Sequence, residues 1–215
     1  MTTVLLAHGS PDGRHRATLE RLRRRVEAPL EAMGRGRTRL VYLEHDHPRP
    51  DELGPELIDE VTVLPMLITP AFHARVDVPA AARALGAAGA PVRVAPALGG
   101  DPLLLAAVEE RLVAAGHAAD VPVLLVAGGS SSGQAGQSLR ALLDEHPRPG
   151  WLSMTLTAPR AGAATDRVVV PATLAEGVLH DKVAALAEAA GAPFVPGGLA
   201  DTDALARLVL RRMLR

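Results

Sequence analysis

Short apolar runs alternate with amphipathic stretches through the first half of the chain. The apolar runs are as long as buried parallel strands, and the amphipathic stretches repeat their apolar positions every three to four residues, which is typical of helices. This pattern predicts strands at residues 3–8, 39–44, 61–69 and 91–98, and helices at residues 18–33, 78–89 and 101–115. Strands that alternate with helices predict a parallel sheet with helices on both faces.

The second half repeats the pattern. It predicts strands at residues 121–127, 151–157, 167–173 and 193–196, and helices at residues 134–143, 179–190 and 203–214. The halves also align residue by residue: AHGS at 7–10 with AGGS at 127–130, VLP at 63–65 with VVP at 169–171, and AP at 95–96 with VP at 195–196. We therefore predict an α/β fold of two tandem doubly wound parallel-sheet domains, residues 1–117 and 118–215, related by internal duplication.

Two histidines stand at the ends of apolar runs in the first half. His8 closes the run VLLAH, and His73 closes the longer run VLPMLITPAFH. Open α/β sheets bind ligands beyond the carboxyl ends of their strands, and imidazole both binds divalent metals and accepts protons near neutral pH. We therefore predict that the two imidazoles face one another across a cleft, where they handle a metal, protons or both.

The duplicated half lacks this pair of histidines. His8 aligns with Gly128 and His73 with Leu179, while His180 stands one residue out of register. A shift of one residue changes where a side chain points, so the duplication kept the fold and lost the pair. We expect Gly128 and Leu179 to shape the opposite wall of the cleft and His180 to lie away from the metal.

Further polar residues follow the predicted strands. Glu44 ends the second strand, which neighbours the first in most doubly wound sheets, so its carboxylate is expected at the same edge as His8. His45 and His47 could point the same way on an extended segment and bind a metal, but a polar run before prolines also fits an exposed loop. His15, between two arginines, could contact an acidic substrate or belong to a solvated basic segment.

Composition excludes several classes of function. A net charge of −1 and 2% aromatic residues give neither the basic patch nor the stacking platform of a nucleic-acid binder. The absence of cysteine excludes disulfides and thiolate metal sites. No signal-peptide pattern and no apolar stretch long enough to span a bilayer occurs, so we expect a cytoplasmic protein with no membrane partner.

Three features together resemble the CbiX/SirB-type sirohydrochlorin chelatases, the class II chelatase family. They are the motif AHGS at residues 7–10, the strand-ending Glu44, and the segment PMLITPAFHARVDVP at residues 65–79. The family segment runs PLFL-x-x-G-x-H-x-R-x-D-I-P, and its usual glycine two positions before the histidine is Ala71 here. The resemblance covers the first 115 residues, and the second half is similar to the degenerate copy in two-domain members.

The resemblance implies a lyase that inserts Co²⁺ or Fe²⁺ into sirohydrochlorin, a carboxylate-rich tetrapyrrole, in cobalamin or sirohaem biosynthesis. It implies catalytic and metal-binding roles for His8 and His73, and a catalytic and substrate-binding role for Glu44. Its further substrate contacts map to Ile68, Thr69, Pro70, Ala71, Phe72 and His73. The divalent metal, which could also be Ni²⁺, is a substrate, and no permanently bound cofactor is expected. The expected form is a monomer of two pseudo-symmetric domains.

The chemistry of metal insertion agrees with this assignment. Two protons must leave the pyrrole nitrogens as the cation enters, so neutral bases are needed beside the metal. A non-catalytic carrier of metal or tetrapyrrole is the alternative that uses the same cleft. A hydrolase or transferase is disfavoured, because the glycine-rich segment at residues 128–133 has no phosphate-loop lysine and its serines have no paired His and Asp.

Overall fold

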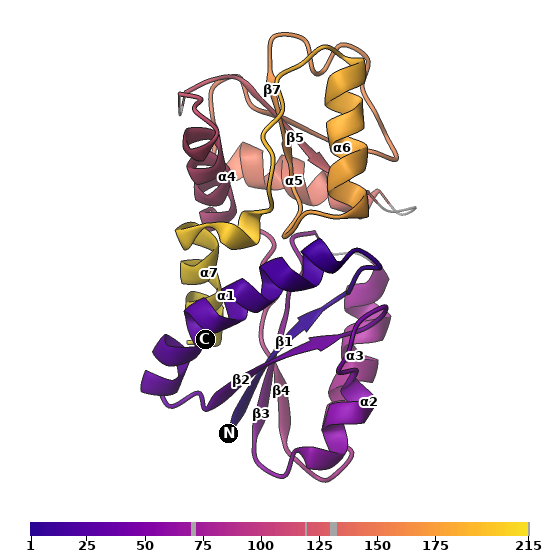
Figure 1. The fold of residues 1–215 in the computed structure, drawn as a ribbon, viewed down its shortest axis with the longest axis vertical. Helices are drawn as coiled ribbons and strands as arrows, with labels where there is room; N and C mark the ends of the chain where they lie inside the picture. Colours follow the sequence, from indigo (N-terminus) through magenta and orange to yellow (C-terminus); the bar gives the residue numbers. More distant parts are fainter. Residues whose placement is uncertain (70–71, 119, 130–132, 215) are drawn as a thin grey trace.

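The computed structural model describes residues 1–69, 72–118, 120–129 and 133–214, without the side chains of residues 72–75. The chain forms two lobes stacked along one long axis, each built on its own parallel sheet (Figure 1). The first sheet has the strand order β2-β1-β3-β4 and the second the order β6-β5-β7. Helices flank both sheets, so the predicted fold class, two tandem doubly wound α/β units, is confirmed.

The first lobe packs helices on both faces of its sheet. Its strands are β1 (Thr2–Ala7), β2 (Arg37–Tyr42), β3 (Val61–Pro65) and β4 (Val92–Val94). Its helices are α1 (Gly13–Ala32), α2 (Pro50–Leu53), the 3₁₀ turn η1 (Gly54–Glu56) and α3 (Phe72–Leu85). Because side chains alternate along a strand, Leu5 of β1 packs in the cluster that contains α1, whereas Val4 and Leu6 pack with α2 and α3.

The second lobe is a smaller version of the same arrangement. Its strands are β5 (Val123–Ala127), β6 (Leu152–Thr155) and β7 (Val168–Pro171), and its flanking helices are α5 (Gln134–Glu145) and α6 (Val178–Ala189). Leu125 of β5 packs in the cluster that contains Leu139 of α5, whereas Leu124 and Val126 pack with Val183 of α6.

Equivalent backbone hydrogen bonds within each lobe show which residues of the two lobes correspond. The Met66 and Ala172 amides donate to the Leu6 and Val126 carbonyls, the Leu43 and Leu156 amides to the Ala7 and Ala127 carbonyls, and the Ala95 and Val195 amides to the Val63 and Val169 carbonyls. Helices α3 and α6 begin at equivalent residues, Phe72 and Val178. The aligned segments of the sequence thus occupy equivalent places, as expected of a duplication.

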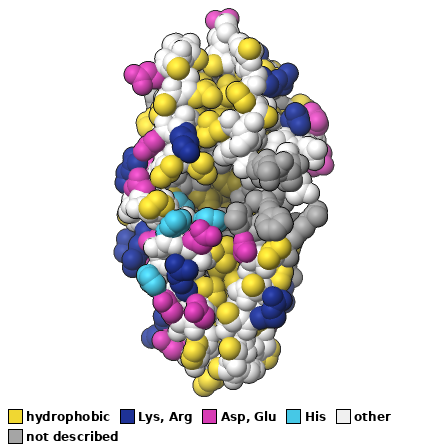
Figure 2. Space-filling view, turned by 90° about the vertical axis from the view of Figure 1, so that its right-hand side faces the viewer, with side chains coloured by type: hydrophobic (Ala, Val, Ile, Leu, Met, Phe, Trp, Pro, Cys, Tyr) yellow, Lys and Arg dark blue, Asp and Glu magenta, His cyan; other side chains and the backbone are white. Residues whose placement is uncertain are grey.

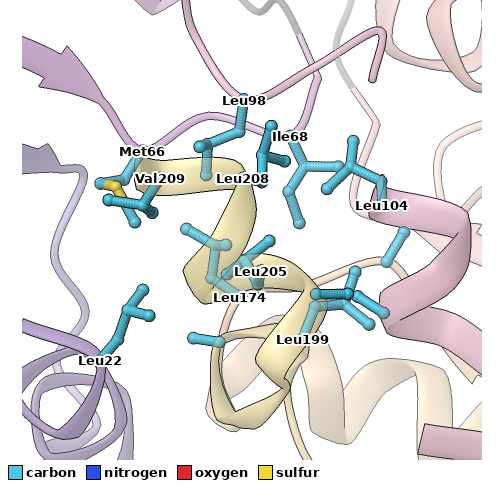
Figure 3. Close-up of a cluster of buried hydrophobic side chains, with 14 of the residues drawn as sticks. Leu22, Met66, Ile68, Leu98, Leu104, Leu174, Leu199, Leu205, Leu208 and Val209 are labelled. Atoms are coloured by element: carbon cyan, nitrogen blue, oxygen red, sulfur yellow. The ribbon is translucent and has the colours of Figure 1, made fainter. Parts of the chain in front are cut away.

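The last helix of the chain packs on the lobe that holds the N-terminus. Helix α7 (Asp203–Met213), which follows the 3₁₀ turn η2 (Leu199–Asp201), contacts α1 and β3 of the first lobe, and both chain ends lie in that lobe (Figure 1). Helix α4 (Leu103–Ala114) lies beside the second lobe, where Glu109 pairs with Arg148 at 2.6 Å. Figure 3 shows Leu205, Leu208 and Val209 of α7 within the resulting cluster of buried side chains.

Helices α4 and α7 are joined by hydrogen bonds and ion pairs at both ends of α7. The carboxylate of Glu110 accepts the amides of Asp203 (2.7 Å) and Ala204 (3.0 Å), which caps α7. At the other end, Arg211 and Arg212 of α7 pair with the buried Asp101, whose carboxylate also accepts the Leu103 amide at 3.0 Å. Each of these helices thus packs on the lobe formed by the other half of the chain, and we call them the exchanged helices. They are fixed by charge-assisted bonds as well as by apolar packing.

The structure moves the starts of two predicted helices. Helix α1 begins at Gly13 rather than residue 18, because the Asp12 carboxylate caps it by accepting the Arg14 amide at 2.9 Å. Helix α3 begins at Phe72 rather than residue 78, and β3 already ends at Pro65, so the prediction that His73 closes a strand is wrong. The helix passes through Pro79, although an interior proline lacks an amide donor and its ring crowds the carbonyl four residues earlier, which costs about 3 kcal/mol.

Of the helices in the described ranges, none has the length and apolar character that crossing a bilayer requires.

Candidate functional site

A cleft of about 550 Å³ lies between the two lobes. It is lined by residues 7–11, 15, 45 and 66–69 of the first lobe and by residues 127–129 and 172–180 of the second. Figure 2 shows the hollow midway along the molecule, with apolar side chains inside it and histidines at its rim. Both walls are formed mainly by segments that come directly after β1 and β3 in the first lobe and after β5 and β7 in the second. Open α/β sheets bind ligands at these carboxyl ends of their strands.

His8 stands directly after β1, at the junction with the segment that follows β2. Its carbonyl accepts the Glu44 amide at 2.8 Å. Gly9 has a φ of +93°, and the Glu44 carbonyl occupies the space where a Cβ of residue 9 would lie. The glycine of the AHGS motif is therefore required by both its backbone angle and its packing, and it holds His8 against the neighbouring loop.

A three-residue turn places His45 opposite His8. The Asp46 amide donates to the Glu44 carbonyl at 2.7 Å across His45, whose φ is +64°. The His8 and His45 ring centroids lie 6.4 Å apart with the rings tilted by 40°. On the other side of the turn, the Ser10 amide donates to the Asp46 carboxylate at 3.3 Å. The two loops thus fix both imidazoles at one end of the cleft.

His15, in the first turn of α1, is the third described histidine on this wall. Its Nδ1 is buried and has no hydrogen-bond partner in the described part of the chain. Burial lowers the pKa of His15 below 6.5, an effect that the charge of Asp46 opposes and the nearby His8 reinforces. The ring is therefore neutral at pH 7 and can accept a proton or a metal ion through a free nitrogen.

Glu44 lies beside the cleft rather than inside it. Strands β1 and β2 are hydrogen-bonded neighbours, so the prediction that Glu44 shares an edge with His8 is confirmed. Its side chain is 55% exposed and lies outside the lining, with Oε2 3.6 Å from Nε2 of His45. The carboxylate is placed to meet a cation or a substrate edge at the rim.

The predicted substrate loop is described only in part. Ile68 and Thr69 line the cleft. Pro70 and Ala71 lie outside the described residues, and Phe72 and His73 belong to the first turn of α3 with their side chains outside the description. The contacts assigned to these four residues stay predictions.

The second-lobe wall is apolar where the first lobe carries its histidines. Gly128 and Leu179 both line the cleft, and the Leu179 side chain lies 3.0 Å from the position that a Cβ of residue 128 would take. Val178 and Leu179 remain 45% and 48% exposed, which leaves a hydrophobic surface at the start of α6. An apolar wall of this kind suits the face of a flat aromatic ligand.

His180 is a structural residue of the second lobe. It is 5% exposed, its Nε2 accepts the Gly197 amide at 3.1 Å, and its ring meets Phe194 edge-on with centroids 5.3 Å apart. Its Nδ1 lies 3.1 Å from the Asp181 carboxylate. Both ring nitrogens therefore have protein partners. His180 also borders the cleft, and its expected position away from the metal stays a prediction.

The arginine next to His15 bridges the lobes. Arg14 pairs with Asp12 and, across the cleft mouth, with Asp181, both at 2.5 Å. This double pair raises the pKa of Arg14 and lowers that of Asp181. Arg14 therefore links α1 and α6 through its pairs with two carboxylates.

His15 and His45 both line the cleft, whereas their sequence context left a solvated segment open for each. A polar run before prolines and a basic helix start are typical of solvated segments. Their positions in the sequence could have indicated a place at the cleft. His15 follows the AHGS motif by only five residues, and His45 directly follows Glu44. Among the residues whose side chains are described, no three His, Asp or Glu converge as a metal-binding group.

Comparisons with known proteins agree with this architecture. The family model described as CbiX matches residues 2–115. No curated protein sequence matches the chain.

Solved structures match almost the whole chain. SirB from Bacillus subtilis with Fe³⁺ has a TM-score of 0.79 at 16% identity, covering 99% of this chain and 94% of that one. SirB from Bacillus subtilis subspecies spizizenii in complex with cobalt has a TM-score of 0.72 at 18% identity, covering 98% and 92%. CbiX, the terminal enzyme for biosynthesis of siroheme in denitrifying bacteria, has a TM-score of 0.69 at 22% identity, covering 100% and 98%.

Proposed function

Because this chain belongs to the CbiX family, we propose that it is a sirohydrochlorin chelatase that inserts Co²⁺ or Fe²⁺ into its macrocycle. Two relatives of the same fold carry iron or cobalt, and a third is the terminal enzyme of siroheme biosynthesis. The metal chosen decides the pathway, which is sirohaem biosynthesis for iron and cobalamin biosynthesis for cobalt.

The observation that carries the proposal is the relation between the two walls of the cleft. Gly128 and Leu179 occupy the places equivalent to His8 and His73, and they lie against one another in the second lobe. The backbones of the two lobes match at these positions. We infer that His8 and His73 hold the incoming metal on one wall, while the macrocycle rests on the apolar opposite wall.

The residues on the first wall then divide the chemistry. His8 and His73 bind the cation through neutral nitrogens, which keeps the metal–protein bonds weak enough for release to the macrocycle. Protons from the two pyrrole N–H groups need acceptors within hydrogen-bond reach, and the neutral imidazoles of this wall can take them. Glu44 at the rim balances the charge of the cation as it moves inward.

The carboxylates of the substrate need donors around the cleft. Helix α6 starts at the cleft with Gly177 as its N-cap and has no side-chain cap, so its first amides are available to an anion. The apolar surface of Val178 and Leu179 adjoins these amides. A carboxylate-fringed, flat macrocycle matches a wall that combines apolar surface with backbone donors.

The direct test is metal insertion under anaerobic conditions. Sirohydrochlorin is mixed with Co²⁺, Fe²⁺ or Ni²⁺, and the change in its absorption spectrum is followed with and without the protein. A chelatase raises the rate well above the spontaneous one for at least one metal. Tight binding of sirohydrochlorin with no rate enhancement for any of the three would establish the alternative, a non-catalytic carrier.

A further inference from the structure

We propose that His45, together with His8, forms a capture site for the divalent metal at the mouth of the cleft, before the metal reaches the macrocycle. The proposal rests on the function proposed above, and it adds a metal-binding residue that the CbiX-like motifs do not contain. Three independent features of the described residues lead to it.

The first feature is the geometry of the two rings. With metal–nitrogen bonds of about 2.1 Å, two imidazoles that share one ion have ring centroids from about 5 Å apart at a tetrahedral angle to about 6.4 Å apart when they bind from opposite sides. His8 and His45 lie at 6.4 Å, within this range, and both line the cleft. This separation fits two rings on opposite sides of one ion, and a tetrahedral ion would need the centroids about 1 Å closer.

The second feature is the charge beside His45. Oε2 of Glu44 lies 3.6 Å from Nε2 of His45, and both side chains are about half exposed to solvent. Two donors of one ion lie about 3 to 3.5 Å apart, so a small rotation lets the carboxylate share the cation with the imidazole. Asp46 adds a second negative charge in the same turn, which favours the approach of a cation from solvent.

The third feature is the backbone of the turn. A φ of +64° is uncommon for a residue other than glycine, and a turn closed by a hydrogen bond across one residue of positive φ is rare and strained. Glycine would occupy this position without strain, yet the chain has histidine here. Strain of this kind concentrates at functional sites, and in this turn it keeps the imidazole at the cleft.

The equivalent turn in the second lobe has no such residue. The matched hydrogen bonds of Leu43 and Leu156 align His45 with Ala158 and Glu44 with Thr157. The turn therefore lost both metal-binding side chains on the wall that lost the histidine pair. A site of two imidazoles and a rim carboxylate binds weakly, as capture followed by transfer requires.

The test measures Co²⁺ binding to the full chain without sirohydrochlorin, by calorimetric titration and by the visible absorption of the bound ion. His45→Gly and His45→Asn both favour the positive φ, so they remove the imidazole without straining the turn. We expect each to weaken Co²⁺ binding about tenfold. His47→Ala is the matched control, because His47 pairs with Glu52 at 2.8 Å outside the cleft, and it should leave Co²⁺ binding unchanged.

A double-mutant cycle with His8→Ala separates a shared ion from independent effects. If the two rings hold one ion, the loss in the double variant is smaller than the sum of the two single losses. In turnover, His45→Gly should raise the apparent KM for Co²⁺ about tenfold and leave the KM for sirohydrochlorin unchanged.

Wild-type Co²⁺ affinity in both His45 variants, each shown to unfold at the wild-type temperature, would overturn the capture site. Losses that add fully with those of His8→Ala would overturn the shared ion. If binding depends on His45 and the wild-type protein still shows no insertion activity, the capture site stands and the chelatase function fails.

Discussion

The two lobes share one backbone frame and differ in the side chains that border the cleft. Among the ionisable residues on the bordering segments of the first lobe, the five candidate site residues have equivalents without charge in the second. His8 corresponds to Gly128, His15 to Ala135, Glu44 to Thr157, His45 to Ala158 and His73 to Leu179. The frame around them is retained, since Leu19 and Leu22 of α1 are buried like their equivalents Leu139 and Leu142 of α5.

The backbone of this fold can therefore be kept while ionisable side chains are absent from one wall of the cleft. The second lobe does have a histidine near the cleft, His180, but the protein itself satisfies both ring nitrogens. In the first lobe, Nδ1 of His15 has no partner among the residues that the structure describes, and His45 lies in a turn with a positive φ. Among the described histidines that line the cleft, the one with a ring nitrogen that no protein group satisfies thus belongs to the first lobe.

The largest effect is expected from His8→Ala, which removes the imidazole from the first wall and tests whether the difference between the lobes matters for function. We expect metal insertion to fall by about 10² to 10⁴, the usual size of the loss when a proton-accepting or metal-binding group is removed. The melting temperature should change by only a few degrees, because the side chain is partly exposed at the end of β1. Insertion rates and thermal unfolding measured on one preparation check both parts. Full activity in the folded variant would remove His8 from the mechanism.

His180→Ala probes the other wall and should give the opposite result. The change removes a buried ring and the acceptor of the Gly197 amide, so we expect a loss of about 2 kcal/mol in the free energy of unfolding. Turnover at temperatures where the variant is folded should stay within about twofold of the wild type. Urea denaturation measures the first effect. A folded variant without metal-dependent turnover would mean that the site is shared between the lobes.

Glu44→Gln should have a smaller effect than either histidine change. It removes the charge of a half-exposed side chain and keeps its shape, so stability should be unaffected. We expect turnover to fall about threefold to tenfold, chiefly through a weaker response to metal concentration. Steady-state kinetics at several Co²⁺ concentrations check this. Equal kinetics in the two proteins would show that the rim charge has no part in metal transfer.

The smallest expected effect is the pH dependence of stability that His15 causes. Burial lowers the pKa of His15 in the folded state, so the unfolded chain takes up its proton first as the pH falls below 6.5. The contribution of the neutral ring to stability is complete above pH 6.5, and it is lost as the pH falls toward the folded-state pKa. His15→Ala, which installs the residue of the second lobe, should flatten the fall in stability below pH 6.5.

Urea midpoints at pH 5, 6, 7 and 8 for the two proteins measure this difference. An unchanged slope in the variant would show that His15 is not the group responsible.

The strands were predictable because buried parallel strands are short continuous apolar runs, and β1, β3, β5 and β7 follow such runs closely. The duplication was predictable for the same reason. Helix starts were not, because the caps that fix them are single side chains such as Asp12. Nothing local in the sequence states which lobe α4 or α7 covers, since an amphipathic helix fits either sheet.

Within the site, the sequence predicted the place of His8 and the edge shared with Glu44. It could not predict the turn at His45, whose direction comes from a positive φ and from the packing of Gly9 against the Glu44 carbonyl. The role of His73 stays a prediction, supported by the place of its equivalent Leu179 on the cleft.

Helix α4 of the first half packs on the second lobe, and α7 of the second half packs on the first. This exchange has an evolutionary consequence. In an assembly of two identical chains, any substitution appears on both walls of a shared cleft, so one wall cannot lose its histidines alone. We propose that residues 1–117 and 118–215 are sequence repeats that fold only together, because α7 completes the lobe built by the first repeat. Covalent linkage then guarantees that each active wall always meets a silent one. The second repeat was then free to change the side chains on its own wall without changing those on the first.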